Sequence, residues 1–442
     1  MKRFSLASLI LVLAVPILFF WNDASAVPAF ARKYHTACST CHLAFPVRNG
    51  FGEAFRNNGY RFPDSTDEGM VKEEPIKLGQ DSYKKIFPKA IWPSDIPNMP
   101  SLGFLARVAG YSQKENGKFR NTQFDEELDI FFAGTITEQI SYIGDVAIAS
   151  NNEPTTLGRI QLLWTFKPGI TMAIGDVGFP EQFDMITMSG GTDPNGYAAQ
   201  MPNPNKGAEL RLTGAAGKSA SYALVAGIGR NSQSDSQATR TTDEGVYDVN
   251  GSGGGGNFAD TKYARLAIKI GGNGLLSGSG GKLGNNQIGL DDSVTFGFNV
   301  LNSSNGTNTN AADYTAGLTN TALGGDIRIT YGNTRLVGQY TRFNQVVDTH
   351  TGENIDTGRR SAVSLEGDYW FYPWLFGAVR YERMKDNLNG EYTKIIPGIG
   401  ALLRPNVKIG IEYAGVSRLN WNDLGLNNTP VSTLGFFAQV GF

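Results

Sequence analysis

The residues most able to do chemistry stand close together near the start of the chain. They form the pattern Cys-x-x-Cys-His, in Cys38-Ser39-Thr40-Cys41-His42. Two thiols at this spacing reach the two vinyl groups of one haem, and the adjacent His42 presents a ring nitrogen to the iron. The pattern therefore predicts one covalently attached haem c, with His42 as the proximal iron ligand.

Two other interpretations of the cysteine pair compete with haem. A redox-active Cys-x-x-Cys pair is expected near a βαβ sequence pattern, which this chain lacks. A zinc site would need two further ligands, and the 442 residues include only two cysteines and three histidines. Because both cysteines fall inside one haem-attachment motif, we favour haem. No residue is assigned as a catalytic acid, base or nucleophile.

The second axial ligand of the iron is less closely fixed by the sequence. Met70 follows His42 by 28 residues, a plausible return distance for a small cytochrome, and methionine is one of the usual axial ligands. We take Met70 as the distal candidate, although it could equally be a packing residue. Met99, His35 and His350 follow as candidates, in that order.

Residues 1–26 have the pattern of a secretory signal peptide. A positively charged start is followed by an apolar run from Ser5 to Trp21 and then by Ala24-Ser25-Ala26. Cleavage is expected after Ala26. An uncleaved membrane anchor is the competing interpretation, because the apolar run is a little long for a signal. Either way, the chain is expected to leave the cytoplasm.

Residues 27–100 are expected to form a small, mostly helical or irregular cytochrome c domain with a connector that leads to the rest of the chain. Val47, Phe51 and Phe55 recur at the spacing of one apolar helix face. This spacing predicts a short helix that could cover the haem. The later part of the segment is rich in proline and charge and lacks periodicity, so we interpret it as the connector.

From residue 101 to residue 442 the pattern changes to alternation with a period of two. Ile160, Leu162 and Trp164 share one face of such a run, and Gln161 lies on the other. Polar inner faces and apolar outer faces are expected of a transmembrane β-barrel with a wet lumen. We therefore predict an all-β transmembrane barrel of about 16 antiparallel strands. The runs begin near residues 102, 123, 139, 157, 170, 206, 220, 262, 293, 322, 334, 360, 374, 391, 407 and 431.

The links between these runs alternate between short and long. Pro168-Gly169 is a tight link and 231–261 is a long one. Outer-membrane barrels show this asymmetry, with short periplasmic turns and long external loops. Residues 271–292 break the alternation, so they form either an unusual turn or a missed strand pair. A soluble propeller would show a repeat of fixed period, and none is visible.

The charge of the chain points away from one class of partner. Lys and Arg number 39 against 41 Asp and Glu, which argues against a nucleic-acid partner. Acidic residues placed in the predicted lumen could guide a cation, or they could be ordinary solvated charges opposed by arginines. These acidic residues are Asp125, Glu127, Asp129, Asp145, Glu209, Glu366, Asp368 and Glu412, and the opposing arginines are Arg107, Arg159, Arg211, Arg328 and Arg380.

A signal peptide, one Cys-x-x-Cys-His motif and a barrel, in this order, resemble the fused monohaem cytochrome–porins of the bacterial outer membrane, including the iron-oxidase cytochromes. The final alternating strand, which ends at Phe442, also resembles an outer-membrane insertion signal. The stretches that carry the family resemblance are Pro28-Ala29-Phe30-Ala31-Arg32-Lys33-Tyr34, Cys38 to His42, Ala44-Phe45-Pro46, Phe51-Gly52 and Asn58-Gly59-Tyr60-Arg61.

The resemblance implies Cys38, Cys41 and His42 as the residues that bind the haem. It implies a barrel embedded in outer-membrane lipid, with the haem domain in the lumen or at the periplasmic mouth. Electrons would pass between an extracellular donor, Fe(II) or another reduced species, and a periplasmic carrier such as a c-type cytochrome, so Fe(II) oxidation is a possible activity. The alternative is a solute porin whose haem-bearing domain acts as a plug or redox gate.

Overall fold

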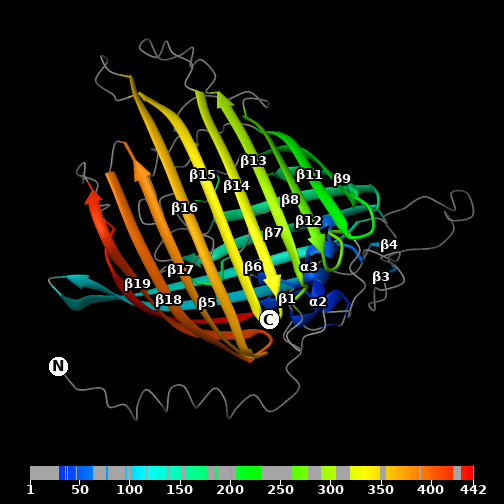
Figure 1. Ribbon diagram of the computed structural model, residues 1–442. Helices are drawn as coiled ribbons and strands as arrows, with labels where there is room; N and C mark the ends of the chain where they lie inside the picture. Colours follow the sequence, from blue (N-terminus) through cyan, green and yellow to red (C-terminus); the bar gives the residue numbers. More distant parts are fainter. Residues whose placement is uncertain are drawn as a thin grey trace, which may run out of the picture.

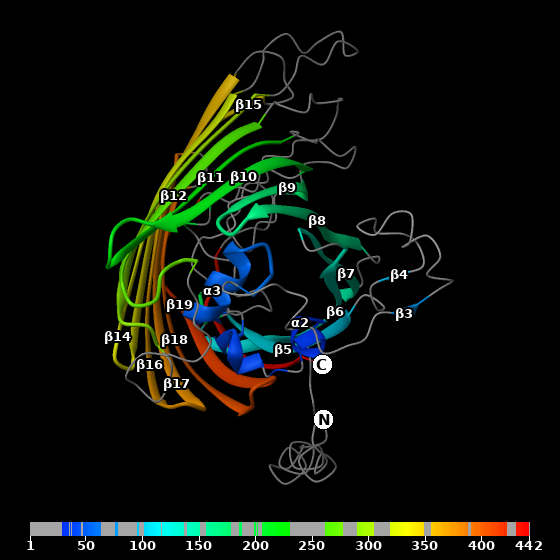
Figure 2. The same ribbon diagram turned by 90° about the vertical axis from the view of Figure 1, so that its right-hand side faces the viewer.

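The computed structural model is dominated by one closed β-barrel, and the short helix α3 (Gly50–Asn57) lies inside its ring of strands (Figures 1 and 2). The described residues are 29–34, 36, 38–45, 47–62, 76–77, 95–96, 101–115, 117–136, 139–150, 156–177, 185–187, 199, 201, 206–229, 261–276, 290–304, 319–348, 355–387, 390–421 and 430–441.

The barrel has sixteen antiparallel strands and closes where β20 pairs with β5, which confirms the predicted barrel and its strand number. Each predicted run corresponds to one strand. The strands are β5 Ser101–Glu115, β6 Lys118–Thr135, β7 Ile140–Ser150, β8 Thr156–Lys167, β9 Ile170–Asp176, β10 Lys206–Ala215, β11 Ala220–Gly229, β12 Thr261–Gly271, β13 Ser293–Ser304, β14 Thr319–Tyr331, β15 Thr334–Asp348, β16 Ile355–Tyr372, β17 Leu375–Asp386, β18 Gly390–Arg404, β19 Val407–Trp421 and β20 Thr433–Gly441.

The barrel wall has apolar side chains on its outer face and polar side chains on its inner face, the reverse of a water-soluble protein. Along β8, Ile160 and Trp164 point outward and are 43% and 44% exposed, whereas Gln161 and Thr165 point inward and are 5% and 6% exposed. Leu163 also faces inward. An outer surface of apolar side chains around a polar interior is what a barrel needs when lipid surrounds it.

The two ends of the barrel differ in the length of their links. At one end, β8 and β9 are joined by residues 168–169, where Gly169 adopts a φ of 84° that a tight turn requires. Long links join β9 to β10 and β11 to β12 at the opposite end. The start of β5 and the end of β20 lie at the short-turn end, because Ser101 pairs with Ala133, near the end of β6.

The link between β12 and β13 is long although it lies at the short-turn end. These two strands pair directly over their whole length, down to Gly271 opposite Ser293. The unusual-turn interpretation of residues 271–292 is therefore correct, and the missed strand pair is wrong. The described parts of this link, residues 272–276 and 290–292, lie against the N-terminal segment.

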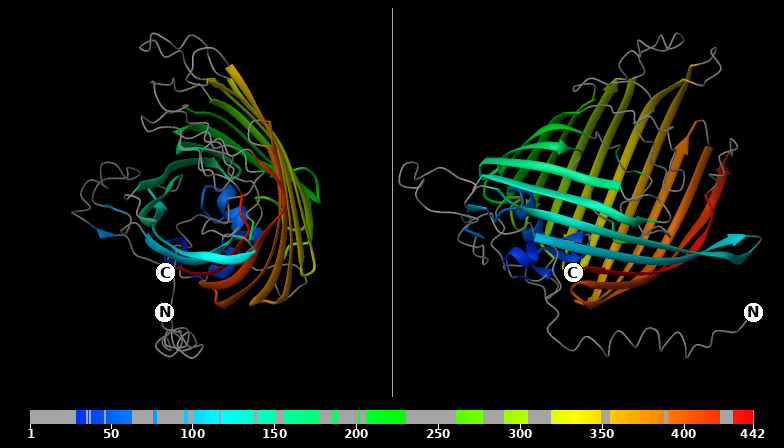
Figure 3. Two further views of the ribbon diagram at one scale, coloured as in Figure 1. Left: turned by 90° about the vertical axis from the view of Figure 1, so that its left-hand side faces the viewer. Right: turned by 180° about the vertical axis from the view of Figure 1, so that it is seen from behind.

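Most of the described N-terminal segment consists of short elements. These are α2 Ala29–Tyr34, the 3₁₀ turn η1 Cys38–Thr40, β1 His42–Ala44, β2 Val47–Arg48 and α3; farther on, β3 Ile76–Lys77 pairs with β4 Asp95–Ile96. In two further views the helices lie at the end of the barrel near the C-terminus (Figure 3). None of the helices in the described residues is both long enough and apolar enough to cross a bilayer.

The predicted helix exists, but one of its three marker residues is not part of it. Phe51 and Phe55 lie on α3 and are buried. Val47 lies in β2 and belongs to an apolar cluster with Trp370 and Phe376 of the barrel wall. The assignment of Val47 to the helix was wrong because the side chain packs against the barrel, a contact that local spacing does not reveal.

Candidate functional site

The Cys-x-x-Cys-His motif forms one compact turn followed directly by a strand. The amide of Cys41 donates to the carbonyl of Cys38 over 3.2 Å, which closes the turn η1. Neither cysteine forms a disulfide, both are partly exposed, and β1 begins at His42. Two separate thiols and an imidazole therefore lie within five consecutive residues of one short turn, as attachment to a single haem requires.

Asn49 ties this turn to helix α3. Its side-chain amide donates to the carbonyls of Ser39 and Thr40 over 3.1 and 3.0 Å, and its backbone amide donates to the carbonyl of Cys41 over 2.9 Å. Its Oδ1 accepts from the amide of Gly52 over 2.9 Å and so caps the helix. Asn49 was not among the residues predicted from the sequence, although an asparagine immediately before a helical segment is a recognised start signal.

Helix α3 lies directly against the motif. A Cβ atom at Gly52 would collide with the carbonyl oxygen of Cys41, so only glycine allows this approach. Asn49 and Gly52 together therefore fix the position of the thiols relative to the helix.

The thiols have the properties of neutral groups. Burial raises the pKa of the Cys38 thiol. Burial, followed by repulsion from the nearby Cys38 thiolate, raises the pKa of the Cys41 thiol to about 12. Redox-active Cys-x-x-Cys pairs instead have a lowered pKa, because they work as thiolates. The surroundings of Cys38 and Cys41 thus differ from those of a disulfide oxidoreductase.

An aromatic cluster surrounds the second cysteine. Cys41 packs against a core of Tyr34, Phe51 and Phe55. On the other side of the motif, the ring of His42 lies 5.3 Å from the ring of Phe45. The cluster is completed by the partly buried residues Phe30, Tyr60 and Phe62.

These features fit a porphyrin. Haem is a large apolar plane, and aromatic side chains beside a thiol provide the apolar surface that such a plane needs. Covalent haem c needs two thiols that bond its vinyl groups and an imidazole that ligates the iron, and Cys38, Cys41 and His42 would supply these groups. Within the described residues, no group of three or more His, Cys, Asp or Glu side chains is arranged to hold a metal ion directly.

The residues predicted as the second axial ligand of the haem iron are not among those that the structure describes. Met70, Met99, His35 and His350 all lie outside the described residues. Met70 therefore stays a prediction.

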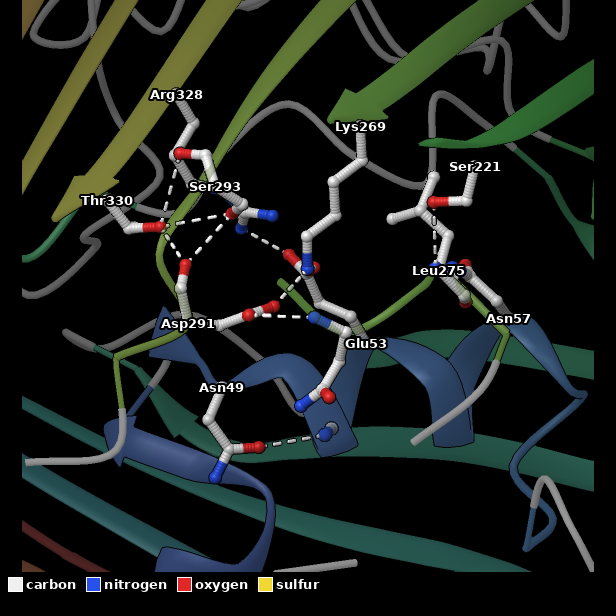
Figure 4. Close-up of polar contacts among 12 residues, drawn as sticks. Asn49, Glu53, Asn57, Ser221, Lys269, Leu275, Asp291, Ser293, Arg328 and Thr330 are labelled. Carbon is white, nitrogen blue, oxygen red and sulfur yellow. Dashed lines mark hydrogen bonds and ion pairs between the residues drawn. The ribbon is translucent and has the colours of Figure 1, made fainter. Parts of the chain in front are cut away.

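A network of buried charges holds α3 against the barrel wall (Figure 4). Glu53 of α3 forms an ion pair with Arg328 of β14, and its other oxygen lies 4.0 Å from Lys269 of β12. Lys269 also pairs with Asp291 over 2.5 Å. Burial alone would raise the pKa of Glu53, but Arg328 and Lys269 outweigh it and lower this pKa to about 2.

Further contacts join the N-terminal segment to other strands at the same end of the barrel. Asn57 donates to the carbonyl of Leu275 over 2.8 Å, and Ser141 of β7 donates to the carbonyl of Gly59 over 2.6 Å. Lys408 of β19 donates to the carbonyl of Phe45 over 2.6 Å. Because β7, β12, β14 and β19 lie around the ring, these contacts hold residues 45–59 against the inner wall at the short-turn end.

Several lumenal carboxylates identified in the sequence are already paired with arginines. Arg107 pairs with Glu127 over 2.6 Å, and Arg335 pairs with both Glu366 and Asp368. Other described ion pairs are Arg211 with Glu209, Arg265 with Asp326 and Arg380 with Glu382. These carboxylates have partners without any bound cation, which favours an ordinary charged lumen over a dedicated path for iron.

A second inward segment, residues 185–187, lies against strand β16. The amides of Ile186 and Thr187, in the link between β9 and β10, donate to the carboxylate of Glu366 over 2.6 and 3.2 Å. Ile186 also shares an apolar cluster with Ala44 and Val47 of the N-terminal segment. The N-terminal segment and residues 185–187 therefore pack in the same apolar cluster on the inner wall.

Comparisons with known proteins add few details. No protein-family model and no curated protein matches the chain. Among solved structures it is similar to the outer-membrane channel DcaP of Acinetobacter baumannii, at 13% identity over 77% of this chain and 96% of that one, with a TM-score of 0.47. It is also similar to OmpF of Salmonella typhi in complex with daunomycin, at 11% identity over 77% of this chain and 97% of that one, with a TM-score of 0.48.

Proposed function

We propose that the chain is an outer-membrane barrel that carries one haem c in its lumen and passes electrons from a reduced donor outside the cell to a periplasmic carrier. In this proposal residues 1–26 are the signal peptide, residues 27–100 are the haem-bearing plug and residues 101–442 are the barrel. The observation that supports it best is the position of Cys38, Cys41 and His42 on a segment anchored inside a closed barrel.

A barrel would let a redox group reach both sides of the outer membrane. The hydrocarbon core of a bilayer is about 30 Å thick and insulates one side from the other. A redox group on the periplasmic surface could not reach a donor outside the cell. A group held in the lumen of a barrel can be approached through the polar interior from one end and through the short-turn mouth from the other.

Each part of the chain has a defined task in this scheme. Haem c, when bound, supplies a one-electron couple. Cys38 and Cys41 would hold it through thioether bonds, and His42 would ligate the iron. Asn49 and Gly52 orient the two cysteines, and the pair of Glu53 with Arg328 keeps the segment in the lumen.

Fe²⁺ is the donor that we favour. It would lose one electron and leave as Fe³⁺, and a one-electron periplasmic carrier such as a c-type cytochrome would take up that electron. Keeping the oxidation outside has a chemical benefit, because poorly soluble Fe³⁺ then forms away from the cell interior.

The second candidate is a solute porin in which the N-terminal segment is a plug or redox gate. The closed barrel with its polar interior favours this function in general terms. The contacts of α3 and of residues 185–187 with the inner wall fit a plug under either function, and the Cys-x-x-Cys-His motif carried by that plug is what favours electron transfer.

Electron transfer across a sealed membrane separates the two functions. The protein is reconstituted in liposomes that contain an oxidised soluble c-type cytochrome, with the long-loop end outward, and Fe²⁺ is added outside. We expect the enclosed cytochrome to be reduced by the wild type and not by Cys41→Ala. Liposome swelling in a small sugar is measured on the same preparation. Sugar flux without reduction of the enclosed cytochrome would contradict the proposal and support the porin.

A further inference from the structure

A cluster of exposed basic side chains lies on the outer face of the barrel, at the long-loop ends of β15 to β19. These five strands are neighbours in the wall (Figure 1). Alternation along the strands directs the basic side chains outward, since their chain neighbours Phe343, Arg360 and Met384 are buried. Among the described outward-facing residues of these strand ends, only Glu391 is acidic. The members of this outer basic cluster are Arg342, Arg359, Arg383, Lys385 and Arg418.

An apolar belt lies next to the outer basic cluster on the same strands, toward the short-turn end. Its side chains are between 44% and 53% exposed, and they are Tyr340, Leu365, Val379, Ile395 and Ile411. At the short-turn end the belt finishes in the exposed aromatic residues Phe371, Tyr372 and Trp374. The two edges of the belt therefore differ in chemistry, with aromatic side chains at one edge and cations at the other.

The height of this belt places the cations at a membrane boundary. From Trp374 to Arg383 the chain advances nine residues. At about 3.3 Å per residue this is about 30 Å along the strand, or about 23 Å across the membrane at a tilt of about 40°. The apolar band of an outer-membrane barrel is about 25 Å tall. The outer basic cluster thus lies at the depth of the lipid headgroups on the long-loop side.

Two members of the cluster already converge on one anion. Arg383 and Arg418 each lie 3.2 Å from a carboxylate oxygen of Glu391. In the register of the sheet these two arginines flank Thr393, one on each neighbouring strand. Long cationic side chains on alternate strands therefore reach a common anion across a small residue that lies between them.

Arg342 and Lys385 repeat this arrangement around Ser361. Ser361 pairs with Arg342 on one side and with Lys385 on the other. Arg359 precedes Ser361 by two residues on the same face of β16, about 7 Å along the strand. Within the described part of the chain, none of these three side chains forms a hydrogen bond or an ion pair. Three cations thus surround one small side chain with a hydroxyl group.

A phosphate group suits this arrangement. A guanidinium group binds phosphate oxygens with two parallel hydrogen bonds, and an ammonium group adds a point charge. Clusters of basic residues of this size beside a membrane bind anionic lipid headgroups. We propose that Arg342, Arg359 and Lys385 bind the phosphate of a lipid headgroup in the leaflet on the long-loop side. A lipid fits better than free phosphate, because the adjoining apolar belt receives its acyl chains.

This inference goes beyond the proposed function and does not depend on haem. Its test uses the purified full-length protein in neutral detergent, with diphosphoryl lipid A as the probe and native mass spectrometry as the readout. Each basic residue beside an anionic lipid contributes about a fivefold change in affinity. We therefore expect the variant Arg342→Gln/Arg359→Gln/Lys385→Gln to bind the probe roughly a hundredfold more weakly than the wild type.

The matched control removes the same charge at the other end of the barrel. Lys167, Lys218 and Arg404 are exposed at the short-turn end. The variant Lys167→Gln/Lys218→Gln/Arg404→Gln should bind diphosphoryl lipid A as the wild type does. The wild type should bind the monophosphoryl form more weakly than the diphosphoryl form, and an excess of inorganic phosphate should not displace the lipid.

Several results would overturn the inference. Unchanged binding in the variant of Arg342, Arg359 and Lys385 would show that these residues do not hold the lipid. An equal loss in the control variant would show that only the total charge matters, and displacement by inorganic phosphate would assign the site to free phosphate. If the triple variant does not give a heat-modifiable barrel, Lys385→Gln alone decides, with an expected loss of about fivefold. Covalent haem content should be the same in all variants.

Discussion

Replacing Glu53 with glutamine should loosen the attachment of α3 to the barrel wall. The carboxylate is buried beside Arg328 and Lys269, and its pKa is lowered from 4.5 to about 2. A difference of this size corresponds to about 3 kcal/mol that favours the ionised, docked form. Removal of one partner from a buried ion pair costs a similar amount, roughly 3–5 kcal/mol.

The effect depends on pH in a defined direction. The pKa in the docked form lies below that of the undocked form, so the stabilisation is complete above about pH 4.5 and disappears as the pH falls toward 2. The ratio of opening rates between Glu53→Gln and the wild type should be roughly two orders of magnitude at pH 7 and about tenfold at pH 3.

Amide hydrogen exchange of the peptide that covers α3 measures this opening directly. Glu391→Gln is the matched control, because it makes the same chemical change in a surface ion pair with Arg383 at the far end of the barrel. Exchange in α3 that is equal in Glu53→Gln and the wild type at pH 7 would refute the reasoning. So would a ratio that does not shrink at low pH.

Four further outcomes are expected. Cys41→Ala should weaken covalent attachment of haem, seen by haem staining, and leave the heat-modifiable gel mobility of the barrel unchanged. Gly52→Ala should lower the covalent haem content per protein in a pyridine haemochrome assay, because its methyl group meets the carbonyl oxygen of Cys41. If Met70 is the distal ligand, Met70→His should lower the midpoint potential in a potentiometric titration. Labels applied to intact cells should reach residues 231–261 and not Pro168-Gly169.

The barrel could be predicted from the sequence because its wall is encoded locally. Outward-facing apolar side chains alternate with inward-facing polar ones along a strand, as in Ile160, Gln161 and Leu162, and this alternation is visible in the sequence. The haem motif could be predicted for a similar reason, since Cys38, Cys41 and His42 are close neighbours in the chain.

Local patterns do not indicate where the N-terminal segment lies, and only the family resemblance implied a position in the lumen or at the periplasmic mouth. The position depends on contacts between residues far apart in the sequence, such as Glu53 with Arg328 and Asn57 with Leu275. Nothing in the local pattern indicates that these residues meet. The long link between β12 and β13 gave the one visible signal, because it broke the alternation of short and long links at the place where the wall contacts α3.

The central claim is that a haem bound at Cys38, Cys41 and His42 accepts electrons from an external donor. Stopped-flow mixing of the purified, oxidised protein with Fe²⁺, followed through the haem absorption spectrum, tests it most directly. We expect conversion to the spectrum of reduced haem c at a rate that rises with the Fe²⁺ concentration. A purified wild-type protein without covalent haem, or an oxidised haem spectrum that Fe²⁺ leaves unchanged, would contradict it.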